Sequence, residues 1–252
     1  MTVILITGAA KRIGKAIALA VAGNNKIIIH YNNSFNDAQD VANTIINNGG
    51  NATILHQNLL DNNAPEILFT NALKIYGSVD TIINCASIFM HDTIYNFSSD
   101  LWQQHQIIHV TVPIIMTHLL TKHITNNNKN ITGNVINIID QRIKRPTPEF
   151  FSYTASKMFM ASITQQCAIA CSPKVRVNGI APGSTLPSPR QNHDDFIKQS
   201  LLTPLQMAVN VSDITNAVNF ILKAHSMTGE IITLDSGQNL DWKTSNFLNC
   251  KE

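Results

Sequence analysis

The chain has no cluster of charges of one sign. Its 18 Lys and Arg nearly balance its 16 Asp and Glu, which leaves a formal net charge of +2 at pH 7. The basic residues are scattered along the sequence, so they predict neither a nucleic-acid site nor a surface that binds anionic membranes. A small molecule is therefore the expected partner.

Cysteine pairs at metal-binding or redox spacing are missing as well. The four cysteines, Cys85, Cys167, Cys171 and Cys250, include no Cys-x-x-Cys pair. This argues against a zinc site and against a disulfide framework, and it favours reduced thiols. No metal site is predicted.

Long apolar runs are also absent. No stretch reaches the roughly 18 uninterrupted apolar residues expected of a membrane span. The early run over residues 3–6 is too short for the core of a signal peptide. We therefore expect a cytoplasmic protein that does not enter the membrane.

The chain does contain a regular alternation of short Ile- and Val-rich runs with longer segments of helical period. Such alternation is typical of buried parallel strands joined by crossover helices. The predicted strands are residues 3–6, 26–30, 51–57, 81–84, 134–139, 174–180 and 231–234, and the clearest predicted helices are residues 13–22, 64–76, 102–124 and 153–170. The expected fold class is α/β, a Rossmann-type, doubly wound, seven-stranded parallel sheet with helices on both faces. We expect one domain over residues 1–252, with 44% hydrophobic residues to fill its core.

Two segments do not fit the alternation. Residues 184–202 contain Pro187 and Pro189 and predict a flap on the substrate side of the sheet. Residues 241–252 form a C-terminal tail, for which a disordered segment and a segment packed near a neighbouring subunit both remain open.

A glycine-containing turn follows the first predicted strand. It reads Thr7-Gly8-Ala9-Ala10-Lys11-Arg12-Ile13-Gly14 and leads into an apolar helix. Such a turn directs backbone amides and a helix N-terminus toward a pyrophosphate. Two glycines alone are weak evidence for a nucleotide site, so the prediction depends on the residues that come later.

The second predicted strand ends without an acidic residue. NAD-binding units usually place a carboxylate there to hold the ribose 2′-hydroxyl, but this strand is followed by Asn33 and Ser34. Lys11 and Arg12 add positive charge at the neighbouring turn, and no carboxylate would repel a 2′-phosphate. The pattern favours NADPH over NADH, although Lys11 and Arg12 as ordinary surface charges remain an alternative.

A possible acid-base group follows the fifth predicted strand. Asp140 comes at its carboxyl end, and Tyr153 and Lys157 follow in a Tyr-x-x-x-Lys spacing that places both on one helix face. A lysine ammonium one turn away would lower the pKa of the tyrosine and make it a better proton donor. This spacing is common by chance, but the glycine turn, the strand-end carboxylate and the Tyr-Lys pair in this order are not.

These motifs identify a resemblance to the short-chain dehydrogenase/reductase family that extends from end to end. It includes the Thr7 turn, Asn84-Cys85-Ala86-Ser87, the Tyr153 and Lys157 pair, Pro182-Gly183 and the closing Leu234-Asp235-Ser236-Gly237. Within that family the chain resembles the pteridine reductases, and more closely the bacterial dihydromonapterin reductases. The resemblance implies an NADPH-dependent enzyme and a homotetramer built on the helices of residues 102–124 and 153–170.

Departures from the common family pattern carry the finer resemblance. Arg12 stands where the usual turn has its middle glycine, Asp140 where ketone reductases have serine, and His109 where the family has asparagine. Phe89 matches the aromatic residue that stacks on the pterin opposite the nicotinamide. For His109, a buried hydrogen-bonded histidine and a proton relay are both open. Asn33 departs from the pteridine reductases, which carry arginine there, and this departure weakens the predicted preference for NADPH.

The resemblance also implies which residues form the site. Catalysis is assigned to Tyr153, Lys157 and Asp140. Substrate binding is assigned to Arg12, Ser87, Phe89, Asp140 and Tyr153. Cofactor binding is assigned to Gly8, Lys11, Arg12, Ile13, Gly14, His30, Asn33, Ser34, Asn58, Asn84, Ala86, Tyr153, Lys157, Pro182 and Gly183.

The predicted reaction is the reduction of a 7,8-dihydropterin to its tetrahydro form, with dihydromonapterin or a relative as substrate and dihydrofolate as a slower one. A carbonyl reductase of the same fold that acts on a 3-oxoacyl or sugar ketone is the first alternative, and serine at position 140 would favour it. A protein that binds NADPH without turnover is the second, and a broken Tyr-Lys pair would favour that.

Overall fold

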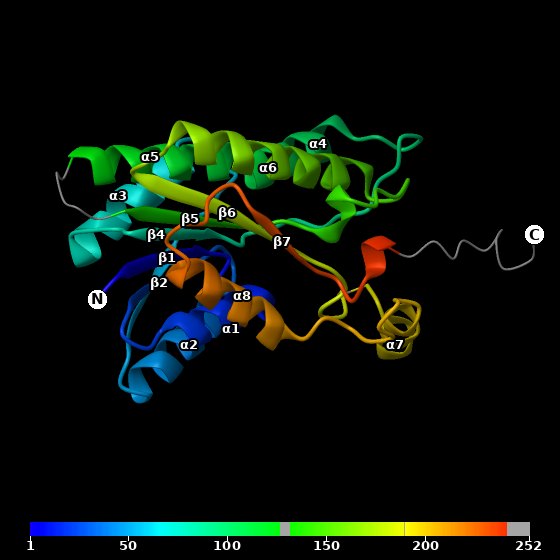
Figure 1. Ribbon diagram of the computed structural model, residues 1–252, viewed down its shortest axis with the longest axis horizontal. Helices are drawn as coiled ribbons and strands as arrows, with labels where there is room; N and C mark the ends of the chain where they lie inside the picture. The colour runs from blue at the N-terminus through cyan, green and yellow to red at the C-terminus, as the bar shows by residue number, and fades with distance from the viewer. Residues whose placement is uncertain (127–131, 189, 241–252) are drawn as a thin grey trace, which may run out of the picture.

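The computed structural model describes residues 1–126, 132–188 and 190–240, and a single parallel sheet lies at its centre (Figure 1). The strand order is β3-β2-β1-β4-β5-β6-β7, with the chain reversing its direction of travel across the sheet after β3. The strands are β1 (Val3–Thr7), β2 (Lys26–Tyr31), β3 (Asn51–His56), β4 (Thr81–Asn84), β5 (Gly133–Ile138), β6 (Val175–Pro182) and β7 (Ile231–Leu234). The predicted fold class is confirmed, and each predicted strand is present with ends shifted by two residues at most.

Helices cover both faces of the sheet (Figure 1). On one face lie α1 (Arg12–Val21), α2 (Phe35–Asn47) and α8 (Val211–Lys223). On the other lie α3 (Ala64–Tyr76), α4 (Ser99–Gln106), α5 (Val112–Asn126) and α6 (Phe151–Ala170). Because side chains alternate along a strand, Ile4 and Ile6 of β1 enter the first core, while Val3 and Leu5 enter the second. The continuous apolar runs of the strands follow from this burial on both sides.

The helix predicted over residues 102–124 is not uniform. A π-helical turn, Ile107–Thr111, separates α4 from α5, and the Val112 N–H donates to the carbonyl of Ile107. The stretch Ser99–Asn126 has the length and composition of a membrane span, but half of its most apolar window is buried inside the fold. It therefore packs as a core helix. Its π-helical turn contains His109, which lies in the candidate site described below.

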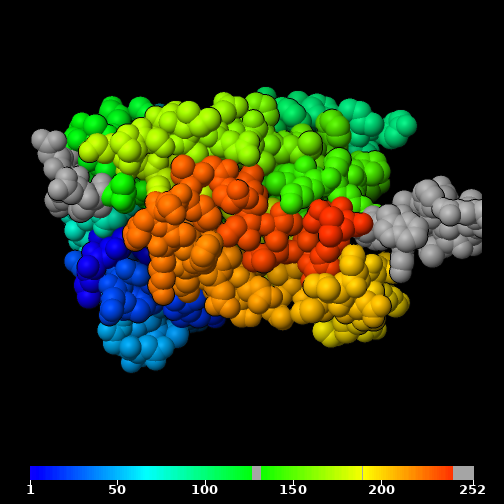
Figure 2. All heavy atoms as spheres, in the orientation of Figure 1, coloured from blue at the N-terminus to red at the C-terminus, as the bar shows by residue number. Residues whose placement is uncertain are grey.

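The segment after β6 lies at one edge of the molecule. It carries α7 (His193–Leu201), which Figure 2 shows in gold beside the red segment near the end of the described chain. The Leu205 N–H donates to the Ser236 carbonyl (3.1 Å), which ties the end of this segment to the turn after β7. Pro189 and the tail of residues 241–252 lie outside the described residues.

Candidate active site

The turn after β1 approaches the loop after β4 closely because its glycines carry no side chain. Gly8 has φ of +65°, and a Cβ there would lie 2.8 Å from the Ala86 Cα. A Cβ at Gly14 would lie 2.2 Å from the Gly8 carbonyl oxygen. Arg12, in the place of the usual glycine, adopts a left-handed φ of 54°, and Ile13 packs on the core below. The N-terminus of α1 has neither a side-chain cap nor an acidic first turn, so its amides remain able to bind an anion.

His30 supports this turn from inside the protein. The Gly8 N–H donates to His30 Nδ1 (3.0 Å), so the ring proton lies on Nε2, which donates to the Gln57 carbonyl (2.9 Å). The ring is 2% exposed, and burial lowers the pKa of His30 to about 4. Both ring nitrogens are engaged within the protein. The structure therefore places His30 behind the turn and not on a surface open to a cofactor.

The free energy of unfolding is expected to fall as the pH drops through the acid range because of His30. The unfolded chain takes up a proton near pH 6.5, whereas folded His30 does so only near pH 4. The unfolded state therefore binds more protons in this window, and acid lowers stability there by up to roughly 3 kcal/mol. Urea unfolding at several pH values, compared between the wild type and His30→Asn, isolates this contribution. Equal pH slopes for the two proteins would contradict it.

Four residues predicted to bind the cofactor lie near the start of α2. Lys11 forms an ion pair with Asp37 in the first turn of that helix (3.0 Å), and both side chains are about half exposed. Ser34 is the residue before α2, and Asn33 beside it is exposed. Asn58, which follows β3, lies close to the loop after β2. Its Oδ1 accepts a hydrogen bond from Asn32 Nδ2 in that loop (3.4 Å). The positive charge of Lys11 is thus partly balanced, which the sequence did not reveal.

The remaining predicted cofactor residues lie at the ends of β4 and β6. Asn84 is 3% exposed, and its Nδ2 donates to Asn137 Oδ1 (2.8 Å), so its side chain joins β4 to β5 and faces the interior. Pro182 ends β6. Gly183 follows it where a Cβ would lie 2.8 Å from the Asp235 Cα, so this close approach requires glycine. The Asn84 amide is therefore engaged inside the sheet.

The three predicted catalytic residues meet at the carboxyl end of β5. The Tyr153 hydroxyl donates to Asp140 Oδ2 (2.8 Å), and the Arg142 N–H donates to Asp140 Oδ1 (2.8 Å). Lys157 Nζ donates to the carbonyl of Ile138 (2.8 Å). Tyr153 is 6% exposed and Lys157 is 2% exposed. The arrangement couples a phenol directly to a carboxylate, with an ammonium group one helical turn away.

The expected lowering of the tyrosine pKa is wrong for this arrangement. Burial, together with the charge and hydrogen bond of Asp140, raises the pKa of Tyr153 well above its usual value. Burial also raises the pKa of Asp140 and lowers the pKa of Lys157 to about 8. For Tyr153, burial is the larger cause, and the Asp140 carboxylate on the phenol acts in the same direction. Tyr153 is held as a protonated phenol.

His109 acts as a neutral connector in this structure. Its Nε2 accepts the Ile88 N–H (3.2 Å), so its Nδ1 carries the proton and donates to Ser156 Oγ (2.8 Å). Ser87 Oγ lies 2.9 Å from the same Nε2 and donates to it. Burial lowers the pKa of His109 well below its usual value, and the residue is 0% exposed. Of the two possibilities left open, the buried hydrogen-bonded histidine describes this arrangement, and it links the loop after β4 to α6.

Phe89 lies beside Tyr153. Its ring meets that of Tyr153 edge to face, with centroids 4.7 Å apart. It also stacks on Phe150, with centroids 4.3 Å apart and planes 11° from parallel. Phe89 and Asp140 therefore both contact Tyr153. Phe150 adopts a left-handed φ of 57°, which is rare for a bulky residue and common where function constrains the backbone.

Arg12 connects the glycine turn to the predicted flap. Its Nη1 donates to the Pro187 carbonyl (2.8 Å), and its Nη2 donates to the Leu186 carbonyl (3.1 Å). The guanidinium is therefore bound to two neutral carbonyl oxygens of that segment. A link between this turn and the segment of residues 184–202 was not predicted.

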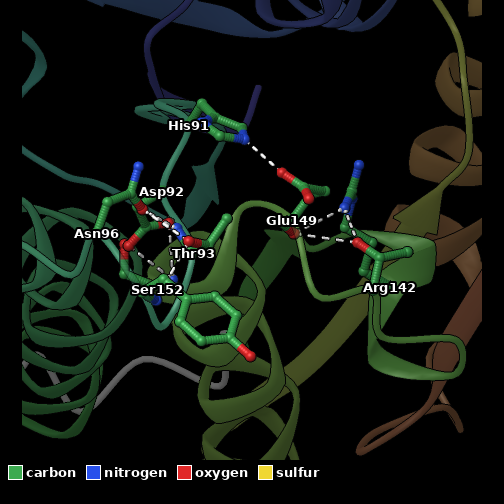
Figure 3. A network of polar contacts seen from close by, with 9 residues as sticks. His91, Asp92, Thr93, Asn96, Arg142, Glu149 and Ser152 are labelled. Carbon is green, nitrogen blue, oxygen red and sulfur yellow. Dashed lines mark hydrogen bonds and ion pairs between the residues drawn. The ribbon is translucent and has the colours of Figure 1, made fainter.

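A polar network joins the loop after β4 to the loop after β5, and the sequence analysis missed it (Figure 3). His91 pairs with Glu149, and the carboxylate of Asp92 accepts the Ser152 N–H (3.1 and 3.2 Å) at the start of α6. Asp92 is 1% exposed. The network fixes the start of the helix that carries Tyr153. In the sequence, Asp92 is an isolated acidic residue in a polar loop, and no other feature of the sequence pointed to it.

Comparison with known proteins agrees with this geometry. The family model of the short chain dehydrogenases matches residues 2–198. The chain belongs to the short-chain dehydrogenase family. Its site thus lies where that fold binds ligands, beyond the carboxyl ends of the strands.

Individual relatives narrow the comparison. The structure is similar to FolM alternative dihydrofolate reductase 1 from Brucella suis, solved in complex with NADP, with 36% identity, a TM-score of 0.92 and coverage of 97% of this chain and 98% of that one. Dihydromonapterin reductase from Escherichia coli is 26% identical over 94% of this chain and 96% of its own. A 3-oxoacyl-[acyl-carrier-protein] reductase from Synechocystis is 27% identical over 93% of this chain and 96% of its own. Because the last two identities are nearly equal, the choice between pterin and ketone depends on the site.

Proposed function

We propose that this short-chain dehydrogenase catalyses the NADPH-dependent reduction of a 7,8-dihydropterin to the tetrahydropterin. The observation that carries the proposal is the Asp140 carboxylate on the Tyr153 hydroxyl, with the Phe89 ring against the ring of the same tyrosine. A ketone oxygen needs a hydrogen-bond donor as negative charge develops. A carboxylate instead suits a heterocycle with ring N–H and amino donors. The substrates named in the Brucella and E. coli relatives support the same reading.

The residues present fit NADPH. The close contact at Gly8 and the uncapped N-terminus of α1 form a cradle for a pyrophosphate, and Ser34 with Lys11 would face a 2′-phosphate. Lys157 would hold the nicotinamide ribose. When bound, NADPH supplies the hydride. The similar Brucella structure was solved with NADP, which supports this choice.

The substrate would lie flat against Phe89, held by Arg12 and Ser87, with its C6=N5 bond beside Tyr153. Tyr153 donates its hydroxyl proton to N5 as C6 gains the hydride, so one proton and one hydride complete the reduction. A protonated Asp140 can return a proton to Tyr153 along their 2.8 Å hydrogen bond. Burial raises the pKa of Asp140, which is the direction that such a proton transfer requires. Because Asp140 keeps some exposed surface, it can regain its proton from solvent.

The two alternatives are less well supported by these residues. A 3-oxoacyl or sugar ketone reductase would have serine at position 140 to donate to the ketone oxygen, and this chain has a carboxylate. A protein that binds NADPH without turnover would be expected to have lost Tyr153 or Lys157, and both are present and buried.

Assembly and location are further parts of the proposal. We propose a homotetramer built on α4 to α6, because that layer exposes Ile114 (39%), Met158 (44%) and Phe159 (58%). We also propose a cytoplasmic location, which agrees with the free thiols of Cys85, Cys167 and Cys171.

The proposed reaction is tested by following NADPH consumption with a panel of substrates. The panel contains dihydromonapterin, dihydrobiopterin, dihydrofolate and a 3-oxoacyl mimic, each offered with NADPH and with NADH. We expect turnover of the dihydropterins with NADPH and little with the oxoacyl mimic. Turnover of the oxoacyl mimic alone would replace the proposal with the carbonyl reductase alternative.

A further inference from the structure

Two arginines outside the proposed reaction flank the stacked rings of Phe89 and Phe150. The Arg142 guanidinium carbon lies 5.8 Å from the Phe89 centroid and 5.1 Å from that of Phe150. The Arg190 carbon lies 5.2 Å and 5.6 Å from the same centroids. Because each cation is nearly equidistant from two rings 4.3 Å apart, both lie alongside the stack and not at its ends. The aromatic pair therefore has two positive charges at its rim.

These two charges have neutral hydrogen-bond partners. Among the residues that the structure describes, neither guanidinium has an acidic oxygen within 4.0 Å. Arg142 donates to Thr147 Oγ1 (2.6 Å), and Arg190 donates to the Phe89 carbonyl (2.8 Å), so these partners are neutral. The charge of Arg142 also acts on Asp140 at longer range. The Asp140 oxygens, however, already accept hydrogen bonds from Tyr153 and from a backbone amide. Donor groups on both arginines remain for a ligand.

We propose that Arg142 and Arg190 bind an anionic group on the substituent of the dihydropterin, a carboxylate or a phosphate. This inference rests on the proposed function and adds the chemical class of the substrate's side chain. Arginine binds both anions through paired N–H donors, and a flat aromatic surface beside it suits the ring that carries them. Arg190 comes from the flap and Arg142 from the loop after β5. An anion held by both would therefore connect these two segments beside the aromatic pair.

The test compares substrates that share the pterin ring and differ in charge. Dihydrofolate carries carboxylates, dihydroneopterin monophosphate carries a phosphate, and dihydrobiopterin is neutral. Arg142→Gln and Arg190→Gln are each expected to raise KM for the matching anionic substrate about 10-fold or more, since a charge-assisted hydrogen bond is lost. KM for dihydrobiopterin should stay nearly unchanged. The anion whose KM rises identifies the source, carboxylate or phosphate.

Two control variants make the outcome specific. Lys144→Gln removes one positive charge from an exposed position in the same loop, and it should leave KM for every substrate unchanged. Arg190→Lys retains the charge, so it should recover part of the loss. Equal effects of the Gln variants on anionic and neutral substrates, or no effect on either, would overturn the inference. If the wild type reduces none of the three dihydropterins, the proposed function itself fails, which is a distinct result.

Discussion

Replacing Tyr153 with Phe is expected to reduce NADPH-dependent turnover about 10³-fold while leaving NADPH affinity unchanged. A positioned acid contributes roughly 10² to 10⁴ in rate, and this hydroxyl is the proton donor in the proposed reaction. The ring itself packs against Phe89, His105 and His109, and phenylalanine retains that packing. The measurement pairs steady-state NADPH oxidation at saturating dihydropterin with a fluorescence titration of NADPH binding.

A tyrosine away from the site provides the matched control. Tyr76 ends α3, and its hydroxyl donates to Asn51 Oδ1 at the start of the edge strand β3 (2.7 Å). Tyr76→Phe removes the same atom and should retain full turnover. If Tyr153→Phe turned over substrate at the rate of Tyr76→Phe, Tyr153 would have no part in proton transfer.

Replacing Asp140 with Ser should change the class of substrate that the enzyme accepts. Dihydropterin turnover is expected to fall about 10²-fold, because serine neither accepts the pterin donors as a carboxylate does nor returns a proton to Tyr153. Reduction of a ketone or a 3-oxoacyl mimic should rise, because serine supplies the hydroxyl donor that a developing alkoxide needs. The measurement is kcat/KM for one dihydropterin and one ketone in each protein.

Asp140→Asn separates the shape of this side chain from its chemistry. Asparagine fills nearly the same space and can still accept the Arg142 N–H, but it cannot carry the proton. It should lose dihydropterin turnover as Asp140→Ser does, without gaining ketone reduction. Wild-type rates on dihydropterin in either variant would show that the carboxylate is dispensable and would remove the main argument for a pterin.

Much of the fold could be predicted from the sequence because its signals are local. The Ile- and Val-rich runs mark strands buried on both faces, and all seven were placed within two residues of their ends. The π-helical turn at Ile107–Thr111 was not predicted, because one additional residue in a turn hardly alters the apolar periodicity. The direction of the pKa shift at Tyr153 could not be predicted from the sequence either. Lys157 is near Tyr153 along the helix, but burial and Asp140 determine the direction of the tyrosine pKa.

The missed residues of the site share one cause. Phe150 and Arg142 contact Phe89 from the loop after β5, and Arg190 contacts it from the segment after β6. No spacing in the sequence links these residues to Phe89. The aromatic pair at residues 150 and 151, separated from Tyr153 by one residue, was the one local signal for Phe150. His30 and Asn84 were correctly placed at strand ends, but whether a strand-end side chain points inward or outward requires the sheet register.

The destination of the hydride tests the central claim most directly. The enzyme would be incubated with NADPH carrying deuterium at both C4 positions of the nicotinamide and with a 7,8-dihydropterin, and the product examined by mass spectrometry and NMR. We predict a tetrahydropterin with one deuterium, located at C6. A product without deuterium at C6, or deuterium found only in an alcohol formed from a ketone substrate, would contradict the account.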